Sequence, residues 1–231
     1  MKKQNKIYQF VSNKKKSLVK PPTIPLSFFE NKKAYESNQA FIVPNMASFI
    51  RDVTEYGNLG ALKIRLLKLS LNDICVLIWW NKFNFLRLMR KEFHMGIFLL
   101  IQLEIIKVLK YKPSMIVLSD QICDLTTALN NSYVIKNFIS LSKKLSIPFG
   151  LMTNNLPSTF KKLSSWKISP ENIFTPINSY GYEMNPTKKE VENYLKFIEK
   201  NKIVAITSSS NSKETKYINQ LGIVQQLRGW F

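Results

Sequence analysis

The stretch 149–210 constrains the fold most, because apolar runs of strand length alternate there with segments of helical periodicity. Three short apolar runs, 149–152, 173–176 and 203–206, have the length of buried strands, and each is followed by polar residues. Short continuous apolar strands that alternate with helices are typical of a parallel sheet that is buried on both faces. The stretch therefore predicts an α/β protein.

Further apolar runs extend this pattern toward both ends of the chain. The run 115–118 predicts the clearest strand, 41–43 predicts another, 223–224 starts a strand that turns polar at 225–226, and the seven-residue run 74–80 suits another buried strand. From 115 onward the strands start roughly 20 to 35 residues apart, as strand–helix units require, and no dinucleotide glycine fingerprint or phosphate loop accompanies them. We therefore expect a (β/α) TIM-barrel-like fold, incomplete or degenerate, with parallel strands and with helices outside.

Capping residues mark several of the expected helices. Thr187 and Glu190 form a capping box at the start of a helix expected over 188–198. Ser48 is placed to cap an earlier helix, and Gly57 is placed to end it. These signals indicate helices between the predicted strands along the chain.

The chain of 231 residues is long enough for one sizeable core, and α/β barrels of about 200 to 250 residues commonly form a single domain. Residues 1–40 combine lysine clusters with prolines and show little periodicity, so we expect a basic extended arm there. The remaining residues, 41–231, are expected to form a single α/β barrel-like domain.

A net charge of +19 is the strongest feature of the composition. Residues 1–112 carry 20 Lys and Arg against 7 Asp and Glu, whereas residues 113–231 carry 14 against 8. Such a charge favours polyanionic partners, either nucleic acid or an anionic membrane, although a solvated lysine-rich surface would have the same composition. Arg87, Arg90 and Lys91 are interleaved with aromatic and apolar residues, which suits either a nucleic-acid surface or the solvated face of an amphipathic helix.

Two cysteines, Cys75 and Cys123, lie far apart in the sequence and do not have the spacing of a metal site. We expect both thiols to be free, buried and reduced, which indicates a cytoplasmic protein. No run of about 18 uncharged apolar residues occurs, so we expect no transmembrane segment.

In a barrel of this type, chemistry gathers at the carboxyl ends of the strands. Asp120 follows the run 115–118 and could serve as an acid, a base or a metal ligand. Polar residues at the same ends are candidates for binding a small ligand: Ser119, Thr153, Asn154, Asn178, Thr207 and Ser208. His94 is the only histidine, so no catalytic triad or histidine metal cluster can be built, and we predict no metal site.

The order of segments in the second half resembles the later half of aldo-keto reductase-like barrels. Segments 150–155, 175–178 and 202–209 stand where that family has a Gly-x-Ser-Asn strand end, a strand with Gln or Asn and an Ala-Tyr-Ser-Pro strand end. The resemblance implies a (β/α)₈ barrel and, for the true reductases, a nicotinamide cofactor whose carboxamide Thr153 and Asn154 would hold. Ser119 and Asp120 stand where the family has the histidine of its catalytic tetrad, and the other tetrad residues are not located in the first half.

Two hypotheses follow from these patterns. The first is an uncharacterised barrel protein of aldo-keto reductase-like type, with a small-molecule enzyme activity, no recognisable reductase tetrad and an unknown cofactor. The alternative is a basic RNA-binding subunit of a ribonucleoprotein particle, in which the first 112 residues bind RNA and the α/β half is a scaffold.

Overall fold

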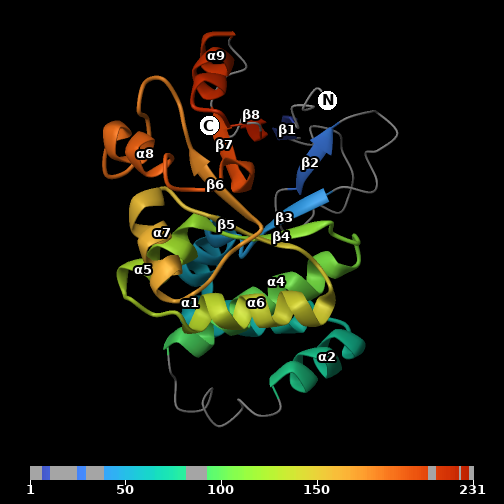
Figure 1. Ribbon diagram of the computed structural model, residues 1–231. Coiled ribbons are helices and arrows are strands. Elements are labelled where there is room, and N and C mark those ends of the chain that lie inside the picture. The colour runs from blue at the N-terminus through green and yellow to red at the C-terminus, as the bar shows by residue number, and fades with distance from the viewer. Residues whose placement is uncertain are drawn as a thin grey trace.

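A computed structural model of the chain describes residues 7–10, 25–29, 39–81, 93–207, 212–223 and 225–228. Five strands run parallel, each paired with the next: β3 (Gln39–Val43), β4 (Met115–Leu118), β5 (Phe149–Met152), β6 (Asn172–Pro176) and β7 (Ile203–Thr207). Helices surround this sheet (Figure 1). The predicted α/β class and the parallel order of the four strands from 115 to 207 are therefore confirmed.

Three more strands lie at the edges of the parallel sheet. β8 (Gln225–Arg228) pairs in parallel with β7, and β1 (Ile7–Phe10) pairs in parallel with β8. β1 also pairs with β2 (Pro25–Phe29) and β2 with β3, both in antiparallel register. A TIM barrel is built from parallel strands alone, whereas two of these strand pairs are antiparallel. The structure therefore shows an α/β fold with a parallel sheet, and the expected TIM-barrel-like fold is not confirmed.

The first 40 residues differ from the expected arm, because β1 and β2 lie within them and pair into the sheet. Each strand is only four or five residues long. Both strands stand beside lysine clusters or prolines in the sequence. An apolar pattern this short, next to such residues, does not predict a strand. β8 also begins later than expected, at Gln225 and not at residue 223.

Side chains of the strands alternate between two apolar clusters, as the period of two requires. One cluster fills the space enclosed by the sheet: Ala40, Ile42, Met115, Val117, Met152, Phe174, Val204 and Ile206. The intervening residues, such as Ile116 and Leu118 of β4, pack against the helices. Gly150 is needed where β5 meets the inner cluster, because a Cβ at this position would lie 2.9 Å from Cε2 of Phe174.

Two helices between β3 and β4 depart from the expectations. α1 (Met46–Leu67) is capped by Asn45, whose side chain accepts a hydrogen bond from the Ser48 N–H, and it continues past Gly57, where φ is 70° and two helical segments meet. α2 (Leu71–Asn81) is a helix, so the strand predicted at 74–80 is wrong. A short apolar run does not by itself distinguish a strand from a helix with little amphipathic contrast.

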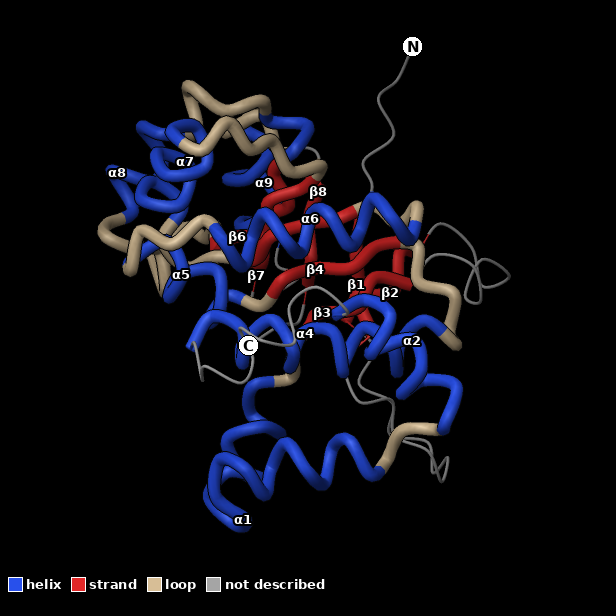
Figure 2. Tube along the Cα trace, turned by 90° about the horizontal axis from the view of Figure 1, so that it is seen from below, coloured by secondary structure: helices blue, strands red, loops and turns tan. Residues whose placement is uncertain are grey.

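The remaining helices cover the parallel sheet: α4 (Phe93–Leu109), α5 (Asp120–Ala128), α6 (Tyr133–Leu145), α7 (Leu156–Ser165), α8 (Lys188–Tyr194) and α9 (Ser212–Gln220). Figure 2 shows α5, α7 and α8 to the left of the strands and α4 and α1 below them when the molecule is seen from below. Thr187 caps α8 as predicted, since its hydroxyl accepts from the Glu190 N–H. The helix ends at Tyr194, four residues earlier than expected.

Candidate functional site

Ser119 lies at the point where β4 passes into α5. Its backbone is still extended, with φ −61° and ψ 149°, and its N–H donates to the Val43 carbonyl of the neighbouring β3. Met115 and Val117 face the inner cluster, so the alternation along the strand turns the side chain of Ser119 toward the same side. This side chain is buried, and its hydroxyl has no hydrogen-bond partner.

Asp120 and Asn154 meet across the carboxyl ends of β4 and β5. The Asn154 Nδ2 donates to Oδ2 of Asp120 at 3.0 Å. Both side chains are half-buried, and Asp120 is in the first turn of α5, where the helix dipole favours a negative charge. The structure thus brings two of the predicted residues, Asp120 and Asn154, into contact, and Ser119 precedes Asp120 in the chain.

Thr153 lies behind this group, in the layer between the sheet and the helices. Its hydroxyl donates to Oδ1 of Asp124 and lies 2.8 Å from the hydroxyl of Thr159. The second oxygen of Asp124 accepts from the Asn154 N–H at 3.0 Å. The side chain of Thr153 is therefore committed to holding α5 and α7 against the end of β5.

Burial controls the acidity of the groups in this layer. It raises the pKa of Asp124, although the hydrogen bonds from Thr153 and Asn154 act in the opposite direction. Burial, together with the negative charges of Asp124 and Asp120, also raises the pKa of the Cys123 thiol. A fully buried thiol with a raised pKa is an inert packing residue.

The other predicted ligand-binding residues do not join the group around Asp120. Asn178 is buried and holds its own loop, because its amide donates to the Tyr182 carbonyl and its Oδ1 accepts from the Tyr182 N–H. Thr207 is also buried, and the alternation along β7 places it on the helix side. Ser208 lies outside the described residues, as do Arg87, Arg90 and Lys91 of the nucleic-acid hypothesis, and so does the side chain of His94.

Sequence analysis missed two contacts that shape this site. No sequence pattern marks Thr159, because its link to Thr153 depends on how α7 packs. The N–H of Asn185 donates to the Asn154 carbonyl at 3.1 Å, so the loop after β6 lies over the end of β5. Both contacts join residues whose proximity is set by tertiary packing, and no local sequence pattern signals them.

A second cluster of buried charges lies between α1 and α4. Arg65 forms ion pairs with Glu104 and with Asp52, and its Nη2 donates to the Ser48 hydroxyl at 3.1 Å. Burial raises the pKa of Glu104, while Lys107 and Arg65 act in the opposite direction. The arginine is matched by two carboxylates, so this cluster ties two helices together. Among the described residues, Oε2 of Glu104 is buried and has no hydrogen-bond partner.

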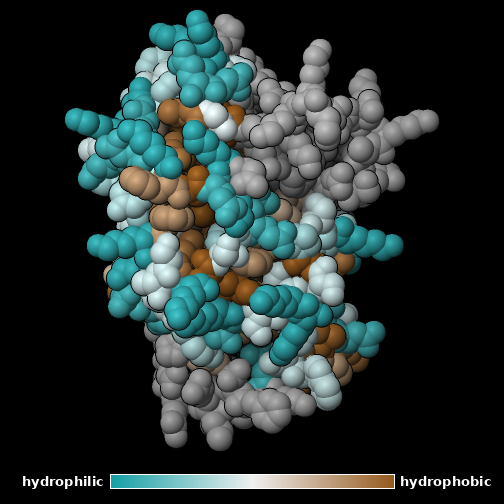
Figure 3. Space-filling model, in the orientation of Figure 1, coloured by the Kyte–Doolittle hydropathy of each residue, from teal (hydrophilic) through white to brown (hydrophobic). Residues whose placement is uncertain are grey.

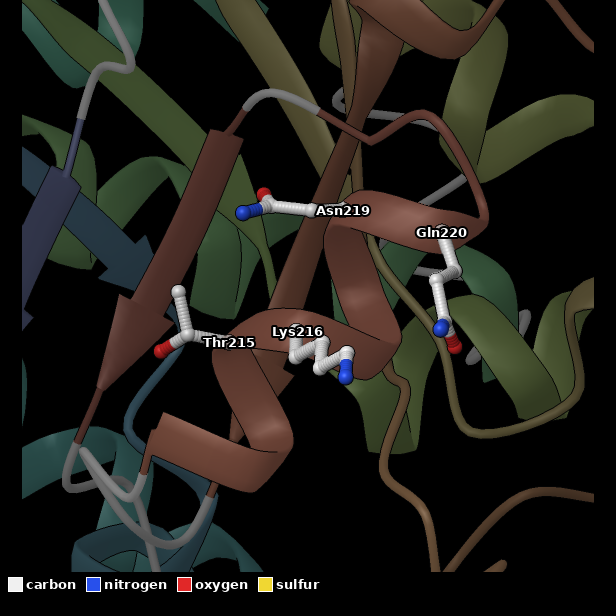
Figure 4. A pocket seen from close by; sticks show the side chains of 4 residues that line it. All are labelled: Thr215, Lys216, Asn219 and Gln220. Atoms are coloured by element: carbon white, nitrogen blue, oxygen red, sulfur yellow. The ribbon is translucent and has the colours of Figure 1, made fainter.

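The exposed surface of α9 holds a shallow depression, shown in Figure 4. Thr215 and Asn219 point to one side of the helix, and Lys216 and Gln220 point to the other. Side chains that diverge in this way do not converge on a common ligand atom, which a binding site requires. We therefore place the candidate site at Asp120 and not at this depression.

Within the described part of the chain, no group of three or more His, Cys, Asp and Glu side chains is arranged to hold a metal ion. None of the described helices is both long enough and apolar enough to cross a bilayer. The fold and the strand-end cluster define an α/β protein with a polar group at the carboxyl edge of a parallel sheet. Comparison with protein-family models, curated proteins and solved structures finds no match.

Proposed function

We propose that the chain binds a small polar molecule at the carboxyl ends of β4 and β5 and acts on it there as an enzyme. The observation that supports this proposal is the buried Ser119 hydroxyl, which has no hydrogen-bond partner among the described residues and whose residue directly precedes the half-buried Asp120. An unsatisfied buried polar group costs about 1–3 kcal/mol. A ligand that hydrogen-bonds to this hydroxyl would recover that free energy.

The polar atoms around this position favour a ligand with hydrogen-bond donors. Asp120 uses only Oδ2 in its contact with Asn154, so its Oδ1 can accept from a ligand. Asn154 uses its Nδ2 in the same contact, which leaves its amide oxygen as an acceptor. A hydroxylated or amine-bearing molecule matches two acceptors and one hydroxyl, whereas the carboxylate repels an anion. Asp120 is then the residue that would exchange a proton with a ligand hydroxyl.

We propose that the chain is related to aldo-keto reductase-like barrels in fold only, and that its parallel strands derive from a TIM-barrel-like ancestor. A nicotinamide does not fit the residues that would hold its carboxamide. The Thr153 hydroxyl is engaged by Asp124 and Thr159, and the Asn154 amide nitrogen by Asp120. We therefore derive no hydride transfer. We retain a cytoplasmic location, because the two cysteines are free thiols.

Isothermal titration of the full chain with myo-inositol, glucose and putrescine, and with citrate as the anionic comparison, tests this proposal. We expect one or more of the first three to bind, and Asp120→Asn to weaken that binding at least about tenfold, the loss of one charge-assisted hydrogen bond. Glu199→Gln is the control, because Glu199 is an exposed carboxylate remote from β4 in the sequence. Binding of citrate alone, no binding of any of the four, or equal binding by Asp120→Asn and the wild type would contradict the proposal.

A further inference from the structure

Helix α2 packs Leu77 and Trp80 against α4 and leaves a second apolar face pointing outward. Asp73 and Asn81 are half-buried: Asp73 accepts from the Ser70 N–H at 3.1 Å, and Asn81 donates to Gln102 of α4 at 2.8 Å. On the opposite face, Leu71 is 82% exposed and Ile78 is 64% exposed. The helix is therefore apolar on its outer face as well as its inner face, whereas a helix on a solvated surface is polar outside.

The exposed apolar face is continuous. Its residues follow the helical spacing i, i+4, i+7 and i+8: Leu71, Cys75, Ile78 and Trp79. Leu67, at the end of α1, is 73% exposed and extends the same surface. Figure 1 shows α2 at the lower right edge of the molecule, and Figure 3 shows brown, hydrophobic atoms among teal ones in that region. A contiguous exposed apolar face of this kind marks an interaction site.

Positive charge flanks this face. Lys63 and Lys68 of the α1 end are exposed. Burial lowers the pKa of Lys107 of α4, and the positive charges of Arg65 and Lys68 lower this pKa further. Lys68 therefore lies close to Lys107. Together with the net charge of +19, this arrangement favours an anionic partner. Two copies of the chain that met through this face would bring lysines against lysines, which opposes self-association.

We propose that the exposed face of α2, with Leu67 and the neighbouring lysines, binds the surface of an anionic lipid bilayer. A single exposed helix is a convex apolar surface, and the boundary between headgroups and acyl chains accepts such a surface. A protein partner would instead need a matching groove. Lys63 and Lys68 then reach the anionic headgroups, while Leu71 and Ile78 enter the apolar side of the boundary.

Flotation of the full chain with lipid vesicles tests this proposal. The wild type should bind vesicles in which roughly a third of the lipid is anionic phosphatidylglycerol more tightly than vesicles of phosphatidylcholine alone, and added salt should weaken that binding. The variant Leu71→Gln with Ile78→Gln should lose at least about tenfold in binding, because glutamine keeps the helix but not the apolar contact. The matched control is Leu129→Gln with Phe197→Gln, two exposed apolar residues on other elements, and it should bind as the wild type does.

A second pair of variants tests the charge. Lys63→Gln with Lys68→Gln should weaken binding to the anionic vesicles by about tenfold and leave the binding to neutral vesicles unchanged. Lys189→Gln with Lys196→Gln, two exposed lysines on or next to α8, is the control. Equal binding by the wild type and the Leu71→Gln, Ile78→Gln variant would overturn the proposal. So would a dimer in sedimentation that this variant abolishes, if the wild type does not float with vesicles, because the face would then join two copies of the chain.

Discussion

Ser119 and Ser142 are both buried serines, with exposed fractions of 3% and 2%, but only one has a hydrogen-bond partner. The Ser142 hydroxyl, in α6, donates to the Ile147 carbonyl just beyond the end of the helix. The Ser119 hydroxyl has no partner. The hydrogen bond of Ser142 stabilises the fold, whereas the unsatisfied hydroxyl of Ser119 costs stability, so we expect the two serines to have different roles.

Replacing each serine by alanine separates these roles. Ser142→Ala should lower the free energy of unfolding by about 1–2 kcal/mol, because the Ile147 carbonyl loses its donor. Ser119→Ala should leave that free energy unchanged or raise it by up to about 1 kcal/mol, because it removes an unsatisfied hydroxyl. Urea unfolding of the ligand-free variants measures both values. A loss for Ser119→Ala as large as that for Ser142→Ala would show that Ser119 is a structural residue.

The strand-end residues show how far sequence could predict the site. Ser119, Asp120 and Asn154 could be named because each follows an apolar run, and parallel strands bring their carboxyl ends to one edge of the sheet. The same argument also selected Thr153, whose hydroxyl instead binds Asp124. Topology predicts which residues reach the edge, but the direction of each side chain depends on its place in the alternation, and the partner of Thr153 lies 29 residues away in the sequence.

At the scale of the element, α2 and α8 form a contrast. α8 was predicted from its capping box and its apolar spacing, and the structure has a helix at that place. α2 was predicted as a strand, because its apolar residues are distributed almost all around the helix and therefore show no helical period. Cys75 was expected to be buried for the same reason, but it is exposed on the outer face of α2. The error arose from the outward-facing apolar residues, which are the ones we assign to a membrane surface.

The apolar face of α8 should account for most of the contribution of that segment to stability. Val191 and Leu195, a helix residue and its C-cap, are 1% and 2% exposed. Replacing either by alanine should cost about 2–4 kcal/mol of unfolding free energy, measured in urea, since each leaves a cavity in the core. Lys189→Ala is the control and should change the free energy by less than about 0.5 kcal/mol. Small and equal changes at all three positions would show that the segment does not pack on the core.

Lys188 is not a suitable control for the same experiment. Its Nζ donates to the Ser179 carbonyl at 2.7 Å and lies 4.6 Å from the centre of the Tyr217 ring. Lys188 and Lys189 are adjacent lysines at the start of the same helix. The structure separates the two, because only Lys188 reaches the loop after β6 and α9.

At the scale of the whole molecule, sequence predicted the parallel half far better than the N-terminal half. β4 to β7 are continuous apolar runs, since both of their faces are buried, and this signal is independent of what the strands pair with. β1 pairs with β8, which is distant in the sequence, and β2 pairs with its sequence neighbours β1 and β3. Strands of only four or five residues leave a weak local pattern, so the antiparallel pairs could not be predicted.

The net charge of +19 is also a property of the whole molecule, and it should make the stability depend on salt. Lysines and arginines outnumber acids by 34 to 15, so most surface charges repel one another, and compact folding brings them closer together. Raising the salt from about 0.02 M to about 0.3 M shortens the screening length and should therefore raise the urea midpoint of the wild type. A midpoint that falls with salt would mean that attractive ion pairs outweigh this repulsion.

Charge reversal at two exposed lysines, Lys136 of α6 and Lys161 of α7, tests the same idea directly. The variant Lys136→Glu with Lys161→Glu lowers the net charge by four and should raise the free energy of unfolding at low salt by roughly 0.5–1 kcal/mol. Its urea midpoint should also depend less on salt than that of the wild type. The control, Lys136→Arg with Lys161→Arg, changes both side chains but keeps the charge, and it should behave as the wild type does at every salt concentration. If both variants respond to salt alike, the repulsion lies elsewhere on the chain and these two lysines do not contribute to it.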